Sequence, residues 1–306
     1  MITVLCGGVG AAKMLRALST VLNPSELTGI VNVGDDLTMH GLRICPDLDT
    51  ITYTLAGLNN TETGWGLAGE SWRVMQELGN LGGEAWFGLG DRDLALHLYR
   101  TQRMAQGDSL ADITADVLRH FGVGITLLPA TEEQIATTFT TYEHGVLSFQ
   151  EYFVKYHHDV SVENVTVANA AQATPSAGVL DAISSAQRVV ISPSNPLISI
   201  GPILAIPGIE AALQQRRDDV VVVSPLIGGK ALKGPADRLL VEQGFSADSR
   251  GVANYYQSFA STLVIDIADA NDAPLVEAAG MHCVVTQTLM SDDQRSRNLA
   301  EVVLDV

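Results

Sequence analysis

The chain has 306 residues, of which 35 are Asp or Glu and 18 are Lys or Arg, so its formal net charge is −17. A protein this acidic lacks the positive surface that binds duplex nucleic acid or an anionic membrane, and we expect neither as a partner. A hydrophobic fraction of 46% with a charged fraction of 17% indicates a globular fold with a buried core and excludes a disordered chain.

The chain has three cysteines, and their spacing is not typical of a metal site. A small and odd number of cysteines does not suit a disulfide framework. This predicts a reducing, cytoplasmic environment. The first residues pass directly into an apolar segment without the charged and apolar parts of a signal peptide, and no apolar run approaches the length of a membrane span. We therefore expect a cytoplasmic protein without a membrane anchor.

The N-terminal segments predict a strand, a glycine turn, a helix and a second strand. The apolar patterns that indicate the strand, helix and strand cover residues 1–6, 11–22 and 27–33. Gly7, Gly8 and Gly10 lie between the first strand and the helix, where free N–H groups attract phosphate. Their spacing matches neither a Walker A motif nor the dinucleotide fingerprint, so a tight turn without a ligand is the alternative.

Four aspartates follow the second strand, at the edge of a parallel sheet where ligands gather. Asp35 and Asp36 come directly after the strand, whereas Asp47 and Asp49 lie in a Pro-led turn before a helix. The structural alternatives are an Asx-turn for Asp47 and a helix N-cap for Asp49. Because Mg²⁺ prefers carboxylate oxygens and substrate phosphates, four carboxylates beside a phosphate cradle predict a magnesium site.

The middle of the chain predicts a helical and β-hairpin insertion. Helical patterns extend to residue 122, and the last of them opens with Ser109 followed by Asp112, a capping-box signature. Residues 123–170 show the patterns of short strands, with a hairpin turn at residues 143–145.

Polar residues are concentrated in the helical segment LGDRDLALHLYRTQ. Carboxylates such as Asp91 at a helix start are favoured by the helix dipole alone. The functional interpretation places Asp91 at a substrate and lets Arg92 and Arg100 reach an anionic or planar ligand, since guanidinium groups match phosphate and stack on rings. His97 is interpreted as a structural residue of the helix.

Three β-branched runs in the C-terminal half predict central parallel strands at residues 188–193, 219–225 and 262–267. The proline-rich loop after the first run carries Ser194, Asn195 and Ser199, which we expect to bind a nucleotide opposite the glycine turn. A plain crossover is the alternative for this loop.

A second glycine-rich strand end, VSPLIGGKALKGPAD, carries the lysine pair Lys230 and Lys233 and predicts phosphate or diphosphate binding. The fold prediction is therefore an α/β protein with a Rossmann-like, doubly wound, mostly parallel sheet. Residues 1–50 and 171–306 would form the nucleotide-binding core, and residues 51–170 the inserted subdomain.

Eight motifs occur in an order that resembles a known family: GGVGAAK, NVGDD, HGLRICPDLDT, GWG, LGDRDLALHLYRTQ, FQEYFV, PSNPLISIGPILAIPGI and VSPLIGGKALKGPAD. The set spans almost the whole chain and resembles the 2-phospho-L-lactate transferases of coenzyme F420 biosynthesis. HGLRICPDLDT followed by GWG is most similar to the bacterial branch.

The resemblance implies a Mg²⁺-dependent enzyme that moves a phosphate bearing a three-carbon acid from a guanosine diphosphate-linked donor to the deazaflavin Fo, with release of GMP. The transferred group would be a 2-phospholactyl, enolpyruvyl phosphate or phosphoglyceryl group. The family usually forms homodimers, so a homodimer is expected here.

By motif match, the resemblance places Asp49 and Arg92 at the acceptor, with the glycine turn and the PSNP loop at the donor nucleotide. The inserted subdomain would then cover the acceptor site. We expect Asp35 and Asp36 to bind the metal, and Asp47 and Asp49 to face the deazaflavin. Asp49 would position the Fo hydroxyl or accept its proton, and is the third predicted metal ligand.

Other functions leave different signatures. A regulatory protein of the same core that binds nucleotide-sugars without transfer is the main alternative, and PDLDT with GDRD favours the transferase. A nucleotide-dependent kinase or synthetase needs a Walker or kinase-like motif, which the sequence lacks. A non-enzymatic partner-binding domain does not account for the Gly, Asp and Pro concentrated at strand ends.

Overall fold

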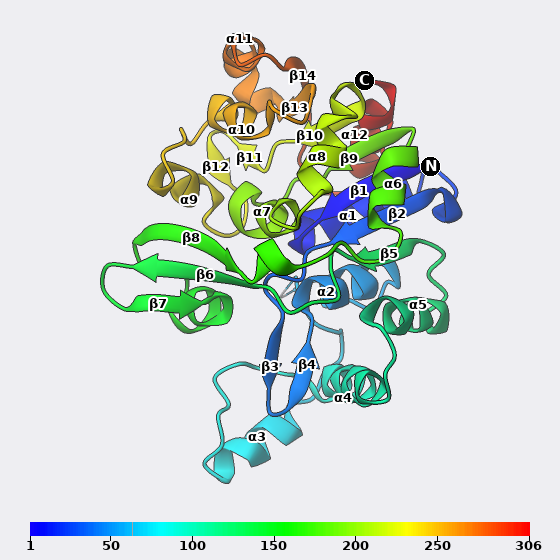
Figure 1. Ribbon diagram of the computed structural model, residues 1–306, viewed down its shortest axis with the longest axis vertical. Coiled ribbons are helices and arrows are strands. Elements are labelled where there is room, and N and C mark those ends of the chain that lie inside the picture. Colours follow the sequence, from blue (N-terminus) through cyan, green and yellow to red (C-terminus); the bar gives the residue numbers. More distant parts are fainter. Residues whose placement is uncertain (63) are drawn as a thin grey trace.

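Seven parallel strands form the sheet on which the rest of the chain is built (Figure 1). The computed structural model describes residues 1–62 and 64–306. The strand order is β14-β13-β10-β9-β1-β2-β5. The strands are β1 (Ile2–Cys6), β2 (Leu27–Val31), β5 (Thr126–Pro129), β9 (Arg188–Ile191), β10 (Val220–Val223), β13 (Thr262–Asp266) and β14 (His282–Thr286).

The strand order reverses between β1 and β9, and this determines where loops meet. From β1 the chain adds β2 and β5 on one side, then returns to β9 on the other side and continues outward. Cys6 of β1 pairs with Val31, and Leu5 pairs with Ile191, so β1, β2 and β9 end at nearly the same level. The loops that follow these three strands therefore start together at the point where open α/β sheets bind ligands.

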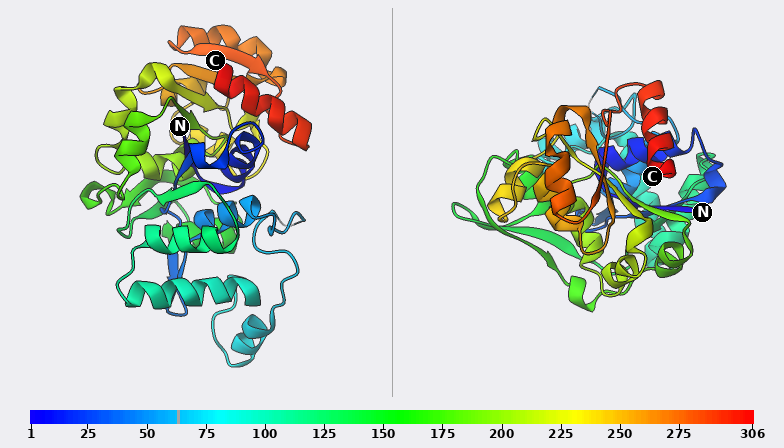
Figure 2. Two further views of the ribbon diagram at one scale, coloured as in Figure 1. Left: turned by 90° about the vertical axis from the view of Figure 1, so that its right-hand side faces the viewer. Right: turned by 90° about the horizontal axis from the view of Figure 1, so that it is seen from above.

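Helices cover both faces of the sheet (Figure 2). On one face α1 packs against α2 and α12, and on the other face α6 packs against α8. Strands β1, β2, β10 and β13 are buried along their whole length, because β-branched and other apolar side chains fill both faces. The helices of this core are α1 (Gly8–Leu18), α2 (Pro46–Leu55), α5 (Leu110–His120), α6 (Val179–Ser185), α7 (Gly201–Leu204), α8 (Ile209–Gln214), α9 (Ala236–Glu242), α10 (Ser249–Tyr256), α11 (Ala273–Ala278) and α12 (Asp293–Asp305).

Two excursions leave the sheet, and each has a small core of its own (Figure 1). The first excursion contains the hairpin β3 (Leu37–Met39) and β4 (Leu42–Ile44) with α3 (Arg73–Asn80) and α4 (Asp91–Ala105). The second is an antiparallel sheet of β6 (Ala136–Thr141), β7 (Gly145–Ser148) and β8 (Val162–Ala168). A further short hairpin joins β11 (Leu226–Ile227) to β12 (Lys230–Ala231).

The predicted fold class is confirmed, and several local predictions change. The range 51–170, expected as an insertion, includes β5, which pairs with β2, and α5, which packs on β5 in the main core. Residues Glu151–Lys155, expected in a strand, form a helical turn. β14 was not predicted, because this edge strand is partly exposed and lacks a fully apolar run. Ser109 does cap α5 by accepting a hydrogen bond from the Asp112 amide.

A side chain at Gly10 should destabilise the protein. A Cβ placed there would lie 2.2 Å from the Pro193 carbonyl oxygen, a backbone atom of the loop after β9. We expect Gly10→Ala to lower the free energy of unfolding by roughly 1–3 kcal/mol, measured by urea denaturation. The matched control is Gly79→Ala in α3, where the Cβ would meet only Ala85 at 3.7 Å. Equal stability of the two variants would contradict the prediction.

Candidate functional site

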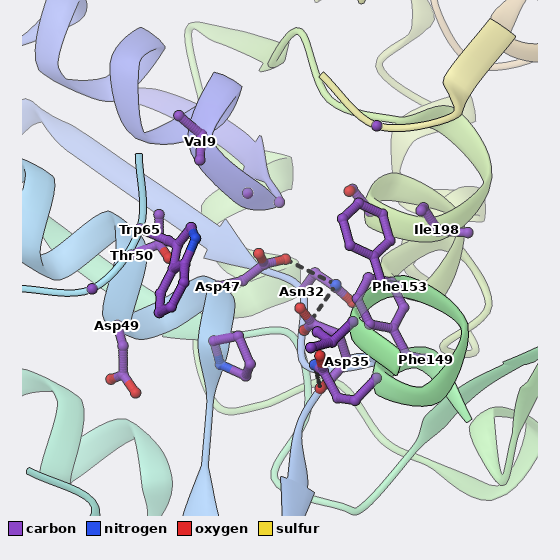
Figure 3. A pocket seen from close by; sticks show the side chains of 18 of the residues that line it. Val9, Asn32, Asp35, Asp47, Asp49, Thr50, Trp65, Phe149, Phe153 and Ile198 are labelled. Carbon is purple, nitrogen blue, oxygen red and sulfur yellow. Dashed lines mark hydrogen bonds between the residues drawn. The ribbon is translucent and has the colours of Figure 1, made fainter. Parts of the chain in front are cut away.

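A cavity of about 560 Å³ opens at the carboxyl end of the sheet, beside the reversal between β1 and β9. The loops after β1, β2 and β9 form its floor, and α2 forms one side. Aromatic residues from both excursions complete the walls. Figure 3 shows its polar centre between Trp65 on one side and Phe149 and Phe153 on the other.

The glycine turn and the proline-rich loop are joined directly. Gly7, Gly8 and Gly10 line the cavity together with Ser194, Asn195 and Ser199. The Ser194 hydroxyl donates to the Gly7 carbonyl oxygen (2.6 Å), and a Cβ at Gly7 would lie 2.5 Å from the Ser199 Cβ. The side chain of Asn195 accepts from the amides of Leu197 and Ile198, so it also caps the helical turn Pro196–Ile200. The structure thus brings together all six residues predicted for the donor.

Two of the four aspartates meet at the centre of the cavity. The Asn32 amide nitrogen donates to Asp47 (3.0 Å) and to Asp35 (3.4 Å), as the dashed lines in Figure 3 show. Asp35 is 5% and Asp47 is 7% exposed, and both line the cavity. Oδ2 of Asp47 would lie 3.2 Å from a Cβ at Gly7, which places the start of α2 against the glycine turn. Asp47 lies in the first turn of α2, not in the Asx-turn that was its structural alternative.

The charge of this pair is not neutralised by a nearby cation. Within residues 1–62 and 64–306, neither Asp35 nor Asp47 forms an ion pair. Burial, and then the charge of Asp47, raises the pKa of Asp35 well above its ordinary value. Burial raises the pKa of Asp47 to about 6, although hydrogen bonds from Asn32 and Gly8 oppose the shift. Two buried carboxylates that face a cavity without a counter-ion fit a divalent cation with oxygen ligands, such as Mg²⁺.

Asp49 lies apart from this pair. It is 5% exposed and lines the cavity, but its carboxylate faces α4, where Arg100 binds both of its oxygens. Burial raises the pKa of Asp49, and the charges of Arg100 and His97 oppose this shift. α2 begins at Pro46 with Cys45 as its N-cap, so Asp49 is not a cap. Asp47 and Asp49, expected to act as one pair, are therefore separated.

Asp36 also differs from the expectation. Its side chain is fully buried and its Oδ2 lies 2.8 Å from Nη2 of Arg43. Burial raises the pKa of Asp36 to about 7, although the Arg43 guanidinium opposes the shift. Asp36 does not line the described cavity. The geometry therefore groups Asp35 with Asp47 rather than with Asp36.

Three further predicted site residues, Asp91, Arg92 and Lys230, lie outside the lining of this cavity. Asp91 accepts hydrogen bonds from Ser71 and from the amides of Arg73 and Val74, at the start of α3. Arg92 is exposed, and its guanidinium donates to the Ala68 carbonyl oxygen.

Lys230 is exposed in the hairpin β11–β12, whereas Lys233 lines the cavity. The Lys233 ammonium also approaches Gly64, where a Cβ would lie 2.5 Å from it. The lysine that reaches the site is therefore the second of the predicted pair.

Comparison with known proteins identifies the family. The sequence profile described as "2-phospho-L-lactate transferase CofD" matches residues 2–300. The chain belongs to this family. It is 41% identical over 309 residues to the phosphoenolpyruvate transferase of Kitasatospora aureofaciens, covering 99% of this chain and 96% of that protein. It is also 41% identical over 318 residues to the protein of that name from Thermobifida fusca, covering 100% and 97%. The predicted family resemblance is confirmed.

Solved structures support the fold. Two structures of a Bacillus halodurans protein, described in one as a member of the UPF0052 family, match with TM-scores of 0.64 and 0.66. Each covers 99% of this chain and 98% of the other chain, at 16% and 19% sequence identity. Among the described residues, no helix is long and apolar enough to cross a membrane.

Several residues of the site were not predicted. Six aromatic residues line the cavity, and Figure 3 shows Trp65 on one side and Phe149 and Phe153 on the other; the remaining three are Tyr53, Trp86 and Phe87. GWG and FQEYFV are among the motifs that carry the family resemblance, but isolated aromatic residues in loops give no periodic signal of a role. Asn32, which joins the two central carboxylates, lies just beyond the end of a buried strand and also went unrecognised.

The protonation of Asp47 should make stability depend on pH in the absence of metal. Its raised pKa means that folding favours the protonated form, so this contribution is complete below pH ~4 and is lost as the pH rises through about 6. With EDTA present, we expect wild type to lose roughly 1.4 kcal/mol of unfolding free energy relative to Asp47→Asn between pH 5 and pH 8.

Urea denaturation at the two pH values measures this difference. Asp305→Asn, on an exposed position of the last helix, is the matched control and should follow wild type. If the free energy of unfolding changed with pH by the same amount in wild type and in Asp47→Asn, Asp47 would not titrate in this range. Adding Mg²⁺ at pH 8 should stabilise wild type more than Asp47→Asn.

Proposed function

We propose that this protein is a cytoplasmic, homodimeric transferase of coenzyme F420 biosynthesis. It moves a phosphate-linked three-carbon acid from a guanosine diphosphate-linked donor to the deazaflavin Fo, and GMP leaves. The observation that carries the proposal is one cavity in which a glycine cradle and two buried, unpaired carboxylates lie between two aromatic walls. Family membership across residues 2–300 supports the same reaction.

The donor would lie over the loops after β1 and β9. Free amides of the glycine turn at the start of α1 suit phosphate oxygens, and Lys233 adds the positive charge that the chain otherwise lacks here. Asp35 and Asp47 would hold Mg²⁺ opposite the diphosphate. The metal would supply charge neutralisation for the phosphate oxygens.

The acceptor ring would lie against one aromatic wall. Deazaflavin is a large planar ring, and Trp65 lies on the side of the cavity where Asp49 lies, while Trp86 and Tyr53 also line the cavity. Phe149 and Phe153 stack with parallel rings 5.4 Å apart and would border the guanine. With the two rings on opposite walls, the attacking hydroxyl and the donor phosphate meet over the polar centre. Such orientation contributes strongly to phosphoryl transfer.

The reaction can be tested directly. We expect incubation with Fo, Mg²⁺ and the guanylated donors, followed by mass detection, to give the phosphodiester product and GMP. The enolpyruvyl donor is the first to test, because the similar proteins are named phosphoenolpyruvate transferases. Asp47→Asn should abolish most of this turnover, and Asp305→Asn should leave it unchanged. Binding of donor without product from any donor would instead support the nucleotide-binding alternative.

The aromatic wall gives a second test. All three tryptophans of the chain lie between residues 65 and 86, so Fo binding should quench the intrinsic fluorescence. Stacking on an aromatic ring is worth roughly 1–3 kcal/mol, so Trp86→Leu should weaken Fo binding by about 5- to 150-fold. Trp72→Leu, which replaces a residue outside the cavity lining, is the matched control. Equal affinity of the two variants would exclude Trp86 from ring binding.

A further inference from the structure

The geometry points to Arg100, assisted by His97, as a positioning residue that fixes the Asp49 carboxylate for the hydroxyl of the acceptor. Asp49 then serves the acceptor, and the metal belongs to Asp35 and Asp47. This inference rests on the proposed transferase function.

Arg100 binds the Asp49 carboxylate on the side away from the cavity. Nη1 of Arg100 donates to Oδ2 of Asp49 (3.1 Å), and Nη2 donates to Oδ1, so the guanidinium binds both oxygens. Arg100 is 4% exposed and does not line the described cavity, whereas Asp49 does. A planar guanidinium paired with a carboxylate in this way fixes the plane of the carboxylate. Each oxygen keeps a further lone pair with which to accept a hydrogen bond from the cavity side.

The His97 imidazole also lies close to the Asp49 carboxylate. It lies one turn before Arg100 on α4 and is 1% exposed. Its Nδ1 is 3.7 Å from Oδ2 of Asp49, and its Nε2 is 3.4 Å from Oδ2 of Asp93. The hydroxyl of Tyr53 donates to Oδ1 of Asp93 (2.6 Å), which restrains Asp93 in turn. Nδ1 of His97 also lies 3.4 Å from Nη1 of Arg100, so the imidazole packs beside the Arg100–Asp49 pair and next to Asp93.

A metal site at Asp49, Asp93 and His97 is the competing interpretation, since ligand atoms of the three lie within 4.8 Å of one another. Two observations argue against it. Asp49 and Asp93 face different nitrogens of the His97 ring, and a single ion can bind only one of these nitrogens. Arg100 already supplies a positive charge to both Asp49 oxygens, so a divalent cation there would be repelled. In the part of the chain that the structure describes, neither Asp35 nor Asp47 pairs with such a cation.

Steady-state kinetics of Arg100→Gln test the inference. Loss of a charge-assisted hydrogen-bond pair should raise KM for Fo roughly 10- to 100-fold. KM for the donor and the Mg²⁺ concentration for half-maximal rate should stay within about twofold of wild type, because neither contacts Asp49. Arg100→Lys keeps the charge without the fork and should give an intermediate KM for Fo.

A matched control separates positioning from stability. Arg103 lies one turn further along α4, pairs with Asp108 and Asp116, and is outside the cavity lining. Arg103→Gln should change thermal stability without changing KM for Fo. In the double variant, Arg100→Gln should add little to the effect of Asp49→Asn, because the two residues act as one unit.

Each outcome decides the question. A KM for Fo that is unchanged in both Arg100→Gln and Arg100→Lys, with only stability reduced, would make Arg100 purely structural and overturn the inference. Additive effects in the double variant would do the same. A raised Mg²⁺ requirement in Asp49→Asn would support the metal site instead. Should Arg100→Gln not fold, Arg100→Lys and His97→Gln provide the same comparison. Absence of transfer by wild type with every donor would instead refute the proposed function itself.

Discussion

The loops that follow β1 and β9 lie in direct contact, and this contact exists because two positions carry no side chain. At Gly10 the backbone of the second loop occupies the space of a Cβ, and at Gly7 the Ser199 side chain does. The Ser194 hydroxyl then joins the loops through Gly7. Because Oδ2 of Asp47 would lie 3.2 Å from a Cβ at Gly7, α2 also lies against the same turn. The position of each polar group in the cavity therefore depends on how closely these loops approach.

The four neighbouring aspartates differ in whether an arginine lies beside them. Residues two apart on a helix point about 200° away from each other, so Asp47 turns to the cavity centre and Asp49 turns to α4. Asp49 and Asp36 each have an arginine partner, which stabilises their ionised form without a ligand. Asp35 and Asp47 have none, and ionising both costs free energy in a buried site. The buried negative charge that Mg²⁺ would balance under the proposed function is thus local to one pair, whatever the total charge of the chain.

Local patterns were sufficient to predict the five central strands of the sheet and the glycine turn, but not the two edge strands β5 and β14, because only apolar runs and the loops at their ends are determined by neighbouring residues. The partners of charged side chains were not predictable in this way. Whether Arg92 or Arg100 meets Asp49 depends on how α4 is rotated against α2, which is a contact between segments some fifty residues apart. Likewise, Lys233 rather than Lys230 reaches the cavity because the hairpin β11–β12 leaves Lys230 in solvent. Tertiary packing determines which arginine contacts Asp49 and which lysine reaches the cavity.

The walls of the cavity differ from its floor in what stabilises them. The floor consists of loops attached to buried strands, whereas the walls belong to two excursions that each pack around a small core of their own. Met39, Met75 and Leu94 support one wall, and Phe139 and Tyr152 support the other. A substitution in one of these cores can reshape the surface that meets a ring without moving the glycine cradle or the carboxylate pair. Under the proposed function, phosphate chemistry would therefore belong to the sheet edge, and ring selection to peripheral elements that can vary separately.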